Sequence, residues 1–249
     1  PVVSSSPSTT RNLVFGIDNG TAPGAWTDHG RLGNAVLIFA LAVHDGQLFA
    51  GTCEAGSDEA GRVFRFDGRE WHDCGAPDRC NSASSLAVHD GELYVGTAKY
   101  RLRGSSLPES ENAHEGGAVF RYAGDNQWEP CGRLPDVEAI HGLVSFGGSL
   151  YAGSMYAPAG FFRYEGGTEW TSLGVPEGKR VESLAVHNGH IYATGYDEGA
   201  VYRYDGRQWE HLGVIPGASQ TYGFATYGGE LYVSEWPHAK VFRYGGGDR

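Results

Sequence analysis

A short pattern that returns five times along the chain constrains the fold more than any other feature of the sequence. Each copy holds two runs of alternating apolar residues around an Asp-Gly, Asn-Gly or Gly-Gly pair, as in LAVHDGQLFAGT at 41–52. Both residues of such a tight turn need a positive φ, which Gly, Asn and Asp adopt most easily. The copies therefore predict five β-hairpins, at 41–52, 86–97, 143–154, 184–195 and 224–235.

Two further strands are predicted after each hairpin. The third strand carries one Arg, as in GRVFRFDG at 61–68, and the fourth carries Trp and then Gly four residues on, as in Trp71 and Gly75. Four short antiparallel strands repeated at about 40 to 57 residues are typical of β-propeller blades. We therefore expect an all-β chain that folds as a five-bladed β-propeller of four-stranded antiparallel blades.

The two ends of the chain predict how the ring closes. The last unit stops after its third strand, KVFRYGG at 240–246, and Trp26-Thr-Asp-His-Gly30 matches the fourth strand that it lacks. An N-terminal outer strand that completes this blade would close the ring and remove exposed sheet edges. However, LVFGIDNG at 13–20 looks like an additional third strand, so a fragment of a six- or seven-bladed propeller is the alternative. We expect a disordered Ser/Thr/Pro lead-in at 1–10 and a single propeller domain at 11–249.

Composition limits the class of partner. The 30 acidic against 19 basic residues give a net charge of −11, which argues against a protein that coats nucleic acid or an anionic membrane. No apolar run is long enough for a spanning helix, so membrane insertion is not expected. The four cysteines allow zero, one or two disulfides, with Cys53 and Cys80 as the first choice in an exported protein. We expect an extracellular or periplasmic location, and a cytoplasmic one stays open.

The turn between the third and fourth strands resembles a known motif. Asp67-Gly68 before Trp71, and Asp205-Gly206 before Trp209, stand where Asp-box propellers carry their motif. Over about residues 24–246 the pattern resembles the kelch-like and Asp-box families. This resemblance implies architecture alone, because the Asp-box Ser and the kelch diglycine are both missing, and no active-site residue is carried over from either family.

Residues that recur in every blade are predicted to build the blade rather than a site. The fourth-strand Trp residues are expected to pack between blades, and the third-strand Arg residues to form structural pairs or to stack on aromatic rings. The recurring His beside the hairpin turn belongs to the same class. These scaffold positions are Trp26, Trp71, Trp128, Trp170, Trp209, Arg65, Arg121, Arg163, Arg203, Arg243, His44, His89 and His187.

Residues that do not recur are the candidates for function. In a propeller, the loops from second to third strands and from fourth to next first strands emerge on one face, here called the top face, where binding sites usually lie. Aromatic residues gather in these loops, and one first-strand position at the channel mouth changes from blade to blade: Phe39, Ser84, His141, Glu182 and Tyr222. Such a ring can supply general acid and base groups to one bound molecule, or simply bind a polar ligand.

We therefore expect a carbohydrate-active propeller with one composite site at the channel mouth, because aromatic rings match the apolar faces of sugars. The candidate reactions are a polysaccharide lyase or a glycoside hydrolase acting on uronate-containing glycan, the hydrolase pairing Glu182 with Glu138 or Glu235. The alternative is a non-catalytic lectin or protein-binding module. The candidate catalytic residues are His141, Tyr222 and Glu182, and the candidate substrate-binding residues are Trp236, Tyr156, Tyr196, Tyr100, Arg101, Lys179, Arg180 and His238.

Two additions to this site are predicted less directly. No cofactor is expected, although His114, His141 and His238 are off-repeat histidines on the top face and three imidazoles can hold zinc or copper. The long insert at 98–117 is either a surface insertion or a lid that brings Arg101, Arg103 and His114 over the channel mouth. The expected partner is a saccharide or another small polar ligand at the top face.

Overall fold

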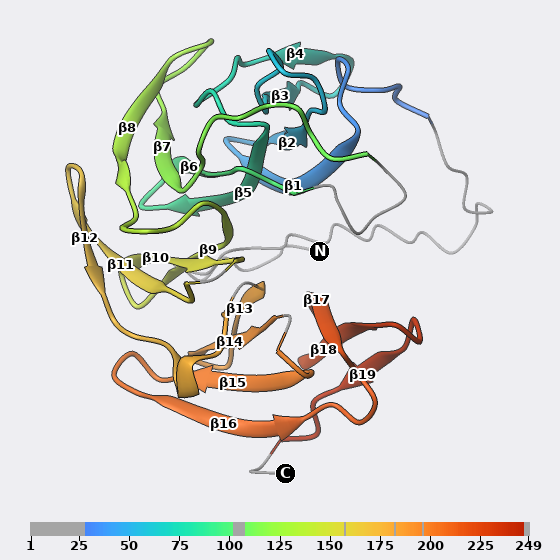
Figure 1. Ribbon diagram of the computed structural model, residues 1–249, viewed down its shortest axis with the longest axis vertical. Helices are drawn as coiled ribbons and strands as arrows, with labels where there is room; N and C mark the ends of the chain where they lie inside the picture. The colour runs from blue at the N-terminus through green and yellow to red at the C-terminus, as the bar shows by residue number, and fades with distance from the viewer. Residues whose placement is uncertain (1–27, 102–107, 157, 182, 196, 247–249) are drawn as a thin grey trace, which may run out of the picture.

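The computed structural model describes residues 28–101, 108–156, 158–181, 183–195 and 197–246 (Figure 1). Those residues form nineteen β-strands and one short 3-10 helix, so the expected all-β class is confirmed. Trp26, Glu182, Tyr196, Arg103 and the expected lead-in at 1–10 lie outside the described residues. In the part of the chain that is described, no helix has the length and apolar character needed to cross a bilayer.

The strands follow the predicted repeat, and we call the successive units blades 1 to 5. Blade 1 comprises β1 (Leu37–His44), β2 (Gln47–Cys53), β3 (Val63–Phe66) and β4 (Trp71–Asp73). Blade 2 comprises β5 (Ser82–His89), β6 (Glu92–Ala98), β7 (Ala118–Tyr122) and β8 (Trp128–Arg133). Blade 3 comprises β9 (Ile140–Phe146), β10 (Ser149–Ser154), β11 (Phe161–Gly166) and β12 (Glu169–Ser172), followed by helix η1 (Pro176–Gly178). Blade 4 comprises β13 (Ser183–His187), β14 (His190–Thr194), β15 (Ala200–Tyr204) and β16 (Trp209–Val214). Blade 5 has β17 (Gln220–Tyr227), β18 (Glu230–Trp236) and β19 (Val241–Arg243).

The five predicted hairpins are confirmed with their turns. In blade 1, Val43 pairs with Leu48 around Asp45 and Gly46, whose φ values are 47° and 73°. The corresponding residues of the other four hairpins also have positive φ, as a tight turn between twisted strands requires. Local sequence therefore sets the register of each first and second strand.

The recurring Trp and Arg residues have the structural roles expected of them. The indole N–H of Trp128 in blade 2 donates to the carbonyl oxygen of Cys74 in blade 1 over 2.8 Å, and Trp170 in blade 3 donates to Cys131 in blade 2 over 2.7 Å. Three of the third-strand Arg residues, Arg121, Arg163 and Arg203, pair with carboxylates of their own blade, whereas Arg65 donates to the amide oxygen of Gln47. These two Trp residues thus join blades 2 and 3 each to the blade before it.

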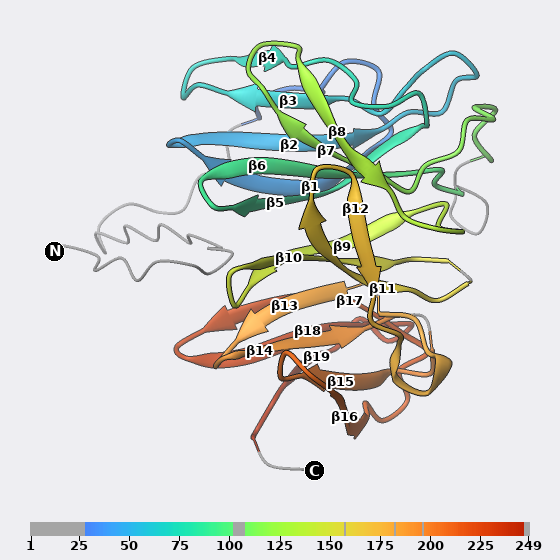
Figure 2. The same cartoon turned by 90° about the vertical axis from the view of Figure 1, so that its left-hand side faces the viewer.

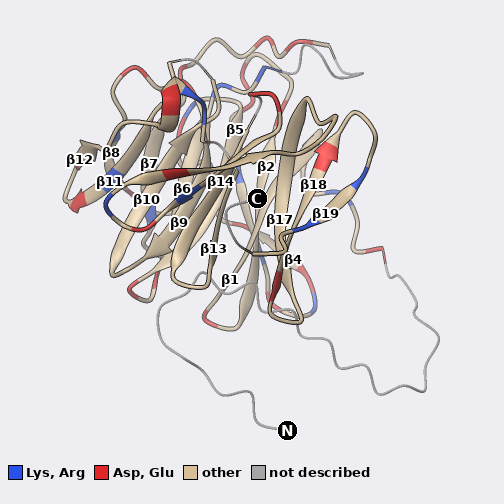
Figure 3. Cartoon of the chain, turned by 90° about the horizontal axis from the view of Figure 1, so that it is seen from below, with Lys and Arg blue, Asp and Glu red and all other residues tan. Residues whose placement is uncertain are grey.

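The blades follow one another in an arc with their first strands innermost (Figures 1 and 2). Blades 1 and 2 are joined by the pairing of Cys53 with Ser82, and the other sheets are separate. Among the described residues, blade 5 has three strands and no strand pairing links it to blade 1. The strands carry few charged residues, which concentrate in turns and loops (Figure 3). Closure of the ring by Trp26 remains a prediction.

The four cysteines are buried thiols in this structure. Burial raises the pKa of Cys53 to about 12 and that of Cys80 to about 11, so both are protonated at neutral pH. The disulfide expected between Cys53 and Cys80 in an exported protein is not formed in this structure. The two thiols instead fill apolar space beside the pairing of blades 1 and 2.

Candidate functional site

A cavity of about 520 Å³ lies where the first strands of all five blades converge. Each first strand contributes a short run of consecutive residues to its lining. The residues of the predicted column that the structure describes are all part of this lining: Phe39, Ser84, His141 and Tyr222. The cavity therefore brings together side chains from distant parts of the chain, as the repeat predicted.

An aromatic cluster forms one side of the cavity mouth. The ring of Phe39 lies edge-on to Tyr100 with centroids 4.5 Å apart, and to His141 with centroids 5.5 Å apart. Tyr100 and Tyr156 both pack against a small buried cluster around Met155. Phe39, Tyr100, His141 and Tyr156, which come from blades 1, 2 and 3, thus form one contiguous group.

Arg101 is attached to this aromatic surface. Its guanidinium lies 4.8 Å from the centroid of the Tyr156 ring, and its backbone N–H donates to the Tyr156 hydroxyl over 3.0 Å. The same guanidinium forms a 2.5 Å ion pair with Glu138 at an exposed position. Sequence reasoning placed Arg101 at the site but did not predict that Glu138 would be its partner. An anionic ligand would have to share Arg101 with that carboxylate.

His141 is neutral at physiological pH. Removal from solvent lowers its pKa from an ordinary value near 6.5 to about 4, since the surrounding protein disfavours the imidazolium. A neutral imidazole offers one nitrogen as a donor and one as an acceptor. His141 can therefore accept a proton or bind a hydroxyl, but it does not attract an anion by charge.

Tyr222 reaches the cavity from blade 5. Its side chain is 42% exposed, and its hydroxyl donates to the Oε1 atom of Gln220 over 2.6 Å. Gln220 was missed by sequence reasoning, although it stands two residues before Tyr222 and so lies on the same face of β17. That spacing was the signal that could have found it.

Ser84 does not contribute a ligand group, in contrast to the prediction for its column. The residue is buried, and its hydroxyl is hydrogen-bonded to the backbone carbonyl oxygen of Ile140 in blade 3. A hydroxyl that is engaged between two blades has a structural role.

The predicted cations between blades 3 and 4 are held by carboxylates. Arg180 forms a 2.9 Å ion pair with Asp197, which also accepts the Arg180 backbone N–H, and this environment lowers the pKa of Asp197 despite its partial burial. Lys179 lies 3.9 Å from Glu198. Neither cation is among the residues that line the cavity.

Trp236 is the last residue of β18, and His238 lies two residues beyond it, before β19. Trp236 is 50% exposed, and His238 lies 3.5 Å from the Oε2 atom of Glu235. The Glu235 side chain is only 1% exposed, and its Oε1 atom accepts the backbone N–H of Lys240 over 3.0 Å. This pair is separate from the residues that line the cavity.

The insert of blade 2 does not form the expected lid in its described part. Asn112 is buried, and its side-chain amide donates to the carbonyl oxygens of Glu59 and Arg79 over 2.9 Å each. His114 donates its backbone N–H to the same side chain. Residues 108–116 therefore tie the loops of blades 1 and 2 together, because the polar groups of those loops need partners once they are buried.

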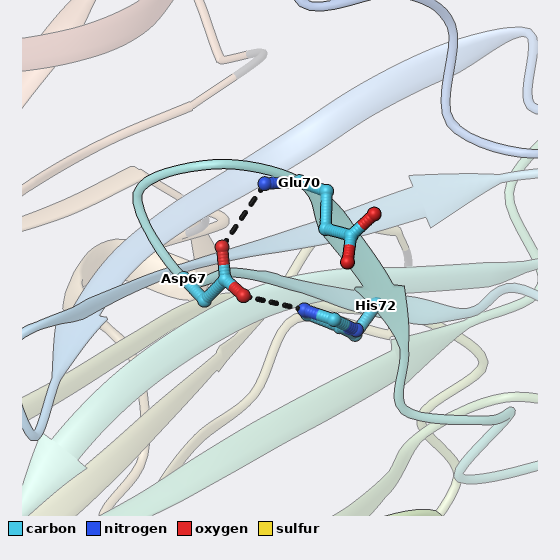
Figure 4. Close-up of side chains that lie close together, drawn as sticks. All are labelled: Asp67, Glu70 and His72. Atoms are coloured by element: carbon cyan, nitrogen blue, oxygen red, sulfur yellow. Dashed lines mark hydrogen bonds and ion pairs between the residues drawn. The ribbon is translucent and has the colours of Figure 1, made fainter.

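The three off-repeat histidines do not form a metal site in the described residues. The grouping of possible ligands found there is Asp67, Glu70 and His72, with ligand atoms within 4.8 Å of one another (Figure 4). Asp67 accepts the backbone N–H of Glu70 and contacts His72, so it closes the turn between β3 and β4. Asp205 closes the equivalent turn of blade 4 in the same way, with no histidine. This grouping belongs to the scaffold.

No family model and no curated protein matches the chain. Solved structures do match in fold. A catalytically inactive histidine variant of virginiamycin B lyase from Staphylococcus aureus, crystallised with quinupristin, has a TM-score of 0.62 at 13% identity, covering 83% of this chain and 69% of that one. The nidogen/laminin complex gives 0.60 at 14%, covering 84% and 76%. A gluconolactonase from Xanthomonas campestris gives 0.55 at 20%, covering 78% and 68%.

The chain has a β-propeller fold. These similarities do not single out the kelch-like or Asp-box families, and at such identities they show the fold alone. Propellers with this fold include enzymes as well as a protein from a binding complex. The function of this propeller has to be argued from its own cavity.

Proposed function

We propose that the mouth of the central cavity binds a uronate-containing saccharide in one composite site. The observation that carries this proposal is the convergence of Phe39, His141 and Tyr222, from three different blades, on one cavity of about 520 Å³. A volume of this size suits a small organic ligand or a few sugar units of a chain. The adjoining rings of Tyr100 and Tyr156 would stack on the apolar faces of sugars.

The groups at this mouth favour elimination over hydrolysis. A glycosidase needs two carboxyl groups on either side of the scissile bond. Glu235 is buried and bonded to Lys240, and Glu138 is paired with Arg101, so neither is a free partner for a second carboxylate. Elimination needs a base, an acid and a cation beside the uronate carboxylate, and Arg101 would supply the cation by exchanging Glu138 for the ligand carboxylate.

In the proposed reaction, Arg101 binds the uronate carboxylate and thereby makes the C5 proton more acidic. Tyr222 or His141 removes that proton, and the other residue protonates the oxygen that leaves from C4. The C5 electron pair forms a C4–C5 double bond as the glycosidic C4–O bond breaks, so the products are an unsaturated uronate and a free sugar end. No oxidant or cofactor enters this balance.

Two of the similar structures are enzymes, so this fold can carry a catalytic site. One neighbour is a lyase whose histidine variant is catalytically inactive, and another is a gluconolactonase. A specific observation also favours binding without catalysis, since a His141 pKa of about 4 makes it a weak base at neutral pH. A lectin or protein-binding propeller is therefore the second candidate. The proposed substrate is an extracellular polymer, so the enzyme reading also implies an exported protein.

The test is to incubate the protein with uronate polysaccharides and to follow the absorbance of the unsaturated product. We expect activity that falls by about a hundredfold or more in His141→Ala and in Tyr222→Phe, as for the loss of an acid or base group. Tyr227→Phe, on the same strand but at the turn end, is the matched control and should keep full activity.

Binding to a glycan array separates the remaining outcomes. Retention of uronate glycans without any product would support the binding module. Equal activity of the wild type and both site variants, with the fold intact by circular dichroism, would remove His141 and Tyr222 from the site.

A further inference from the structure

The outer edge of blade 5 is open in the described residues. β19 pairs with β18 alone, whereas the third strands of the other four blades pair on both sides. A groove of about 500 Å³ runs beside this edge. Its lining is mostly apolar and includes Leu212, Val214, Leu231, Tyr232, Phe242 and Tyr244. An apolar groove beside an unpaired strand is suited to bind one more strand with a large apolar side chain.

The complete blades show what occupies the equivalent place. In blade 2, Trp128 packs into the cluster between blades 1 and 2 and donates to the Cys74 carbonyl oxygen. In blade 3, Trp170 does the same with Cys131. Leu212 of blade 4 stands three residues after Trp209, as Cys74 stands three residues after Trp71, and it lines the open groove. The groove is therefore shaped for a fourth-strand Trp.

Residues 28–30 already have the conformation of the end of a fourth strand. The Gly30 N–H donates to the Asp28 Oδ1 atom over 2.8 Å, and Gly75 donates to Asp73 over the same distance in blade 1. The φ values of the two glycines are 81° and 80°. The segment Trp26-Thr-Asp-His-Gly30 thus shares with Trp71-His-Asp-Cys-Gly75 both its sequence pattern and the geometry of its described part.

The turn that follows, at residues 32–35, has the same backbone hydrogen bond as the links between blades. Ala35 donates its N–H to the Leu32 carbonyl oxygen over 3.1 Å. The same three-residue step joins Val137 to Leu134 before blade 3, and Ala218 to Ile215 before blade 5, over 3.3 and 3.1 Å. Residues 30–35 therefore lead into blade 1 as the links from complete fourth strands lead into blades 3 and 5.

The same residues dock on blade 1 as a fourth strand docks on the next blade. His29 lies edge-on to Phe66 with centroids 5.0 Å apart, at the position where Cys74 meets Tyr122 between blades 1 and 2. Leu32 is buried against Ala50 and Phe64. Residues 29–32 thus cover blade 1 as the end of a fourth strand from a neighbouring blade would. The sheet to which such a strand belongs is that of another blade.

We propose that residues 26–30 add to β19 as the fourth strand of blade 5, with Trp26 in the groove, and thereby close the ring. The register follows from the complete blades, where Tyr204 pairs with Trp209 and Arg203 with Glu210. By the same register Tyr244 pairs with Trp26, and Arg243 with Thr27. This inference does not depend on the proposed function.

A backbone feature of blade 5 fits this register. Ala239 has a φ of 55°, an unfavourable value for a residue with a Cβ atom. Gly117 and Gly199, which have φ values of 85° and 68°, hold this position before β7 and β15. Their carbonyl oxygens accept the N–H of Leu134 and of Ile215 from the end of the fourth strand. In the closed ring the Ala239 carbonyl oxygen would accept the N–H of Leu32.

The chain's own segment is favoured over a second copy because the anchor is already in place. Leu32 and His29 are docked on blade 1, and along the chain one residue separates Thr27 from His29 and two separate Trp26 from it. Within one molecule the effective concentration of this strand beside the groove is high.

The test is a disulfide between β19 and the added strand. Thr27→Cys combined with Arg243→Cys places two thiols opposite each other in an antiparallel pair, at a separation that suits a disulfide. We expect mild oxidation to link them within one molecule, as read by peptide mass analysis. Thr27→Cys with Arg203→Cys is the matched control, because Arg203 already faces Glu210, and it should stay unlinked.

Two outcomes of this experiment would overturn the proposal. A disulfide between two molecules would assign the strand to a second copy, and a yield no higher than that of the control would show that residues 26–30 do not pair with β19.

Thermal unfolding provides a second measurement if the double variant folds poorly. Trp26→Ala should lower the Tm by roughly 10 °C, since it would empty a pocket between blades. Trp236→Ala removes a half-exposed Trp and should shift the Tm by less than about 2 °C. Equally small shifts in both variants would contradict the assignment of Trp26.

Discussion

Single residues of this chain are understood only when compared with their counterparts in other blades. Glu235 has the charge of a catalytic carboxylate, yet it does what Thr52, Thr97 and Ser154 do at the same second-strand position. In each case a side-chain oxygen accepts the N–H at or just before the next strand, and in blade 5 that N–H belongs to Lys240. His141 differs, because its position at the cavity carries another kind of residue in every described blade.

The burial of His141 makes stability depend on pH. Its pKa is about 4 in the folded protein and near 6.5 in the unfolded chain, so the unfolded state binds the extra proton between these values. The free energy of unfolding should therefore fall as pH is lowered from about 6.5 to 4, by on the order of 2 to 3 kcal/mol. Urea unfolding of the wild type and of His141→Gln at several pH values measures this. Parallel pH profiles for the two proteins would contradict it.

Glycine residues in the second strands determine how closely neighbouring blades approach each other. A Cβ atom on Gly51 would lie 2.3 Å from the Ala83 carbonyl oxygen, and one on Gly153 would lie 2.0 Å from that of Val181. Both contacts are with the backbone of the next blade, which has no flexible end to move aside. Glycine at this position allows the first strand of the next blade to pack directly against the sheet.

Gly153→Ala should therefore destabilise the protein by about 2 to 4 kcal/mol, because the new methyl group would force two blades apart. Gly245→Ala is the matched control, since a Cβ atom there meets nothing within 4 Å and the residue has no positive φ. We expect the control to stay within about 0.5 kcal/mol of the wild type in urea unfolding. A similar midpoint for the two variants would exclude this account of blade spacing.

At the scale of the whole molecule, the apolar side chains left exposed mark the opening of the arc. Leu41 of blade 1 is 61% exposed and Tyr227 of blade 5 is 77% exposed, although equivalent residues of the inner blades are packed between neighbours. Exposed apolar groups at both ends of one arc are expected where two surfaces are meant to meet. Closure through residues 26–30 would bury them.

Hydrogen exchange measures this closure across the molecule. We expect the amides of β19 to be protected to a degree similar to those of β15, since in the closed ring both strands pair on two sides. Trp26→Ala should accelerate exchange in β19 by about tenfold or more and leave β7 unchanged. Fast exchange of β19 in the wild type would show that the edge stays open.

The amino-acid sequence was sufficient for the hairpins, the order of strands and the separation of scaffold from candidate residues. These features depend on turn chemistry and on alternation within a strand, which act over a few residues, and on a repeat that identifies structural Trp and Arg by their recurrence. The convergence of Phe39, His141 and Tyr222 on one cavity was also predictable, because equivalent positions of a cyclic repeat face the same axis.

Tertiary structure alone decided which candidate groups are free to act. The pairing of Arg101 with Glu138, of Arg180 with Asp197 and of Asn112 with two loops joins segments that share no local pattern. The neutral state of His141 likewise follows from desolvation by several blades together. Charge and hydrogen bonding depend on every group within a few ångströms, and the sequence does not list those neighbours.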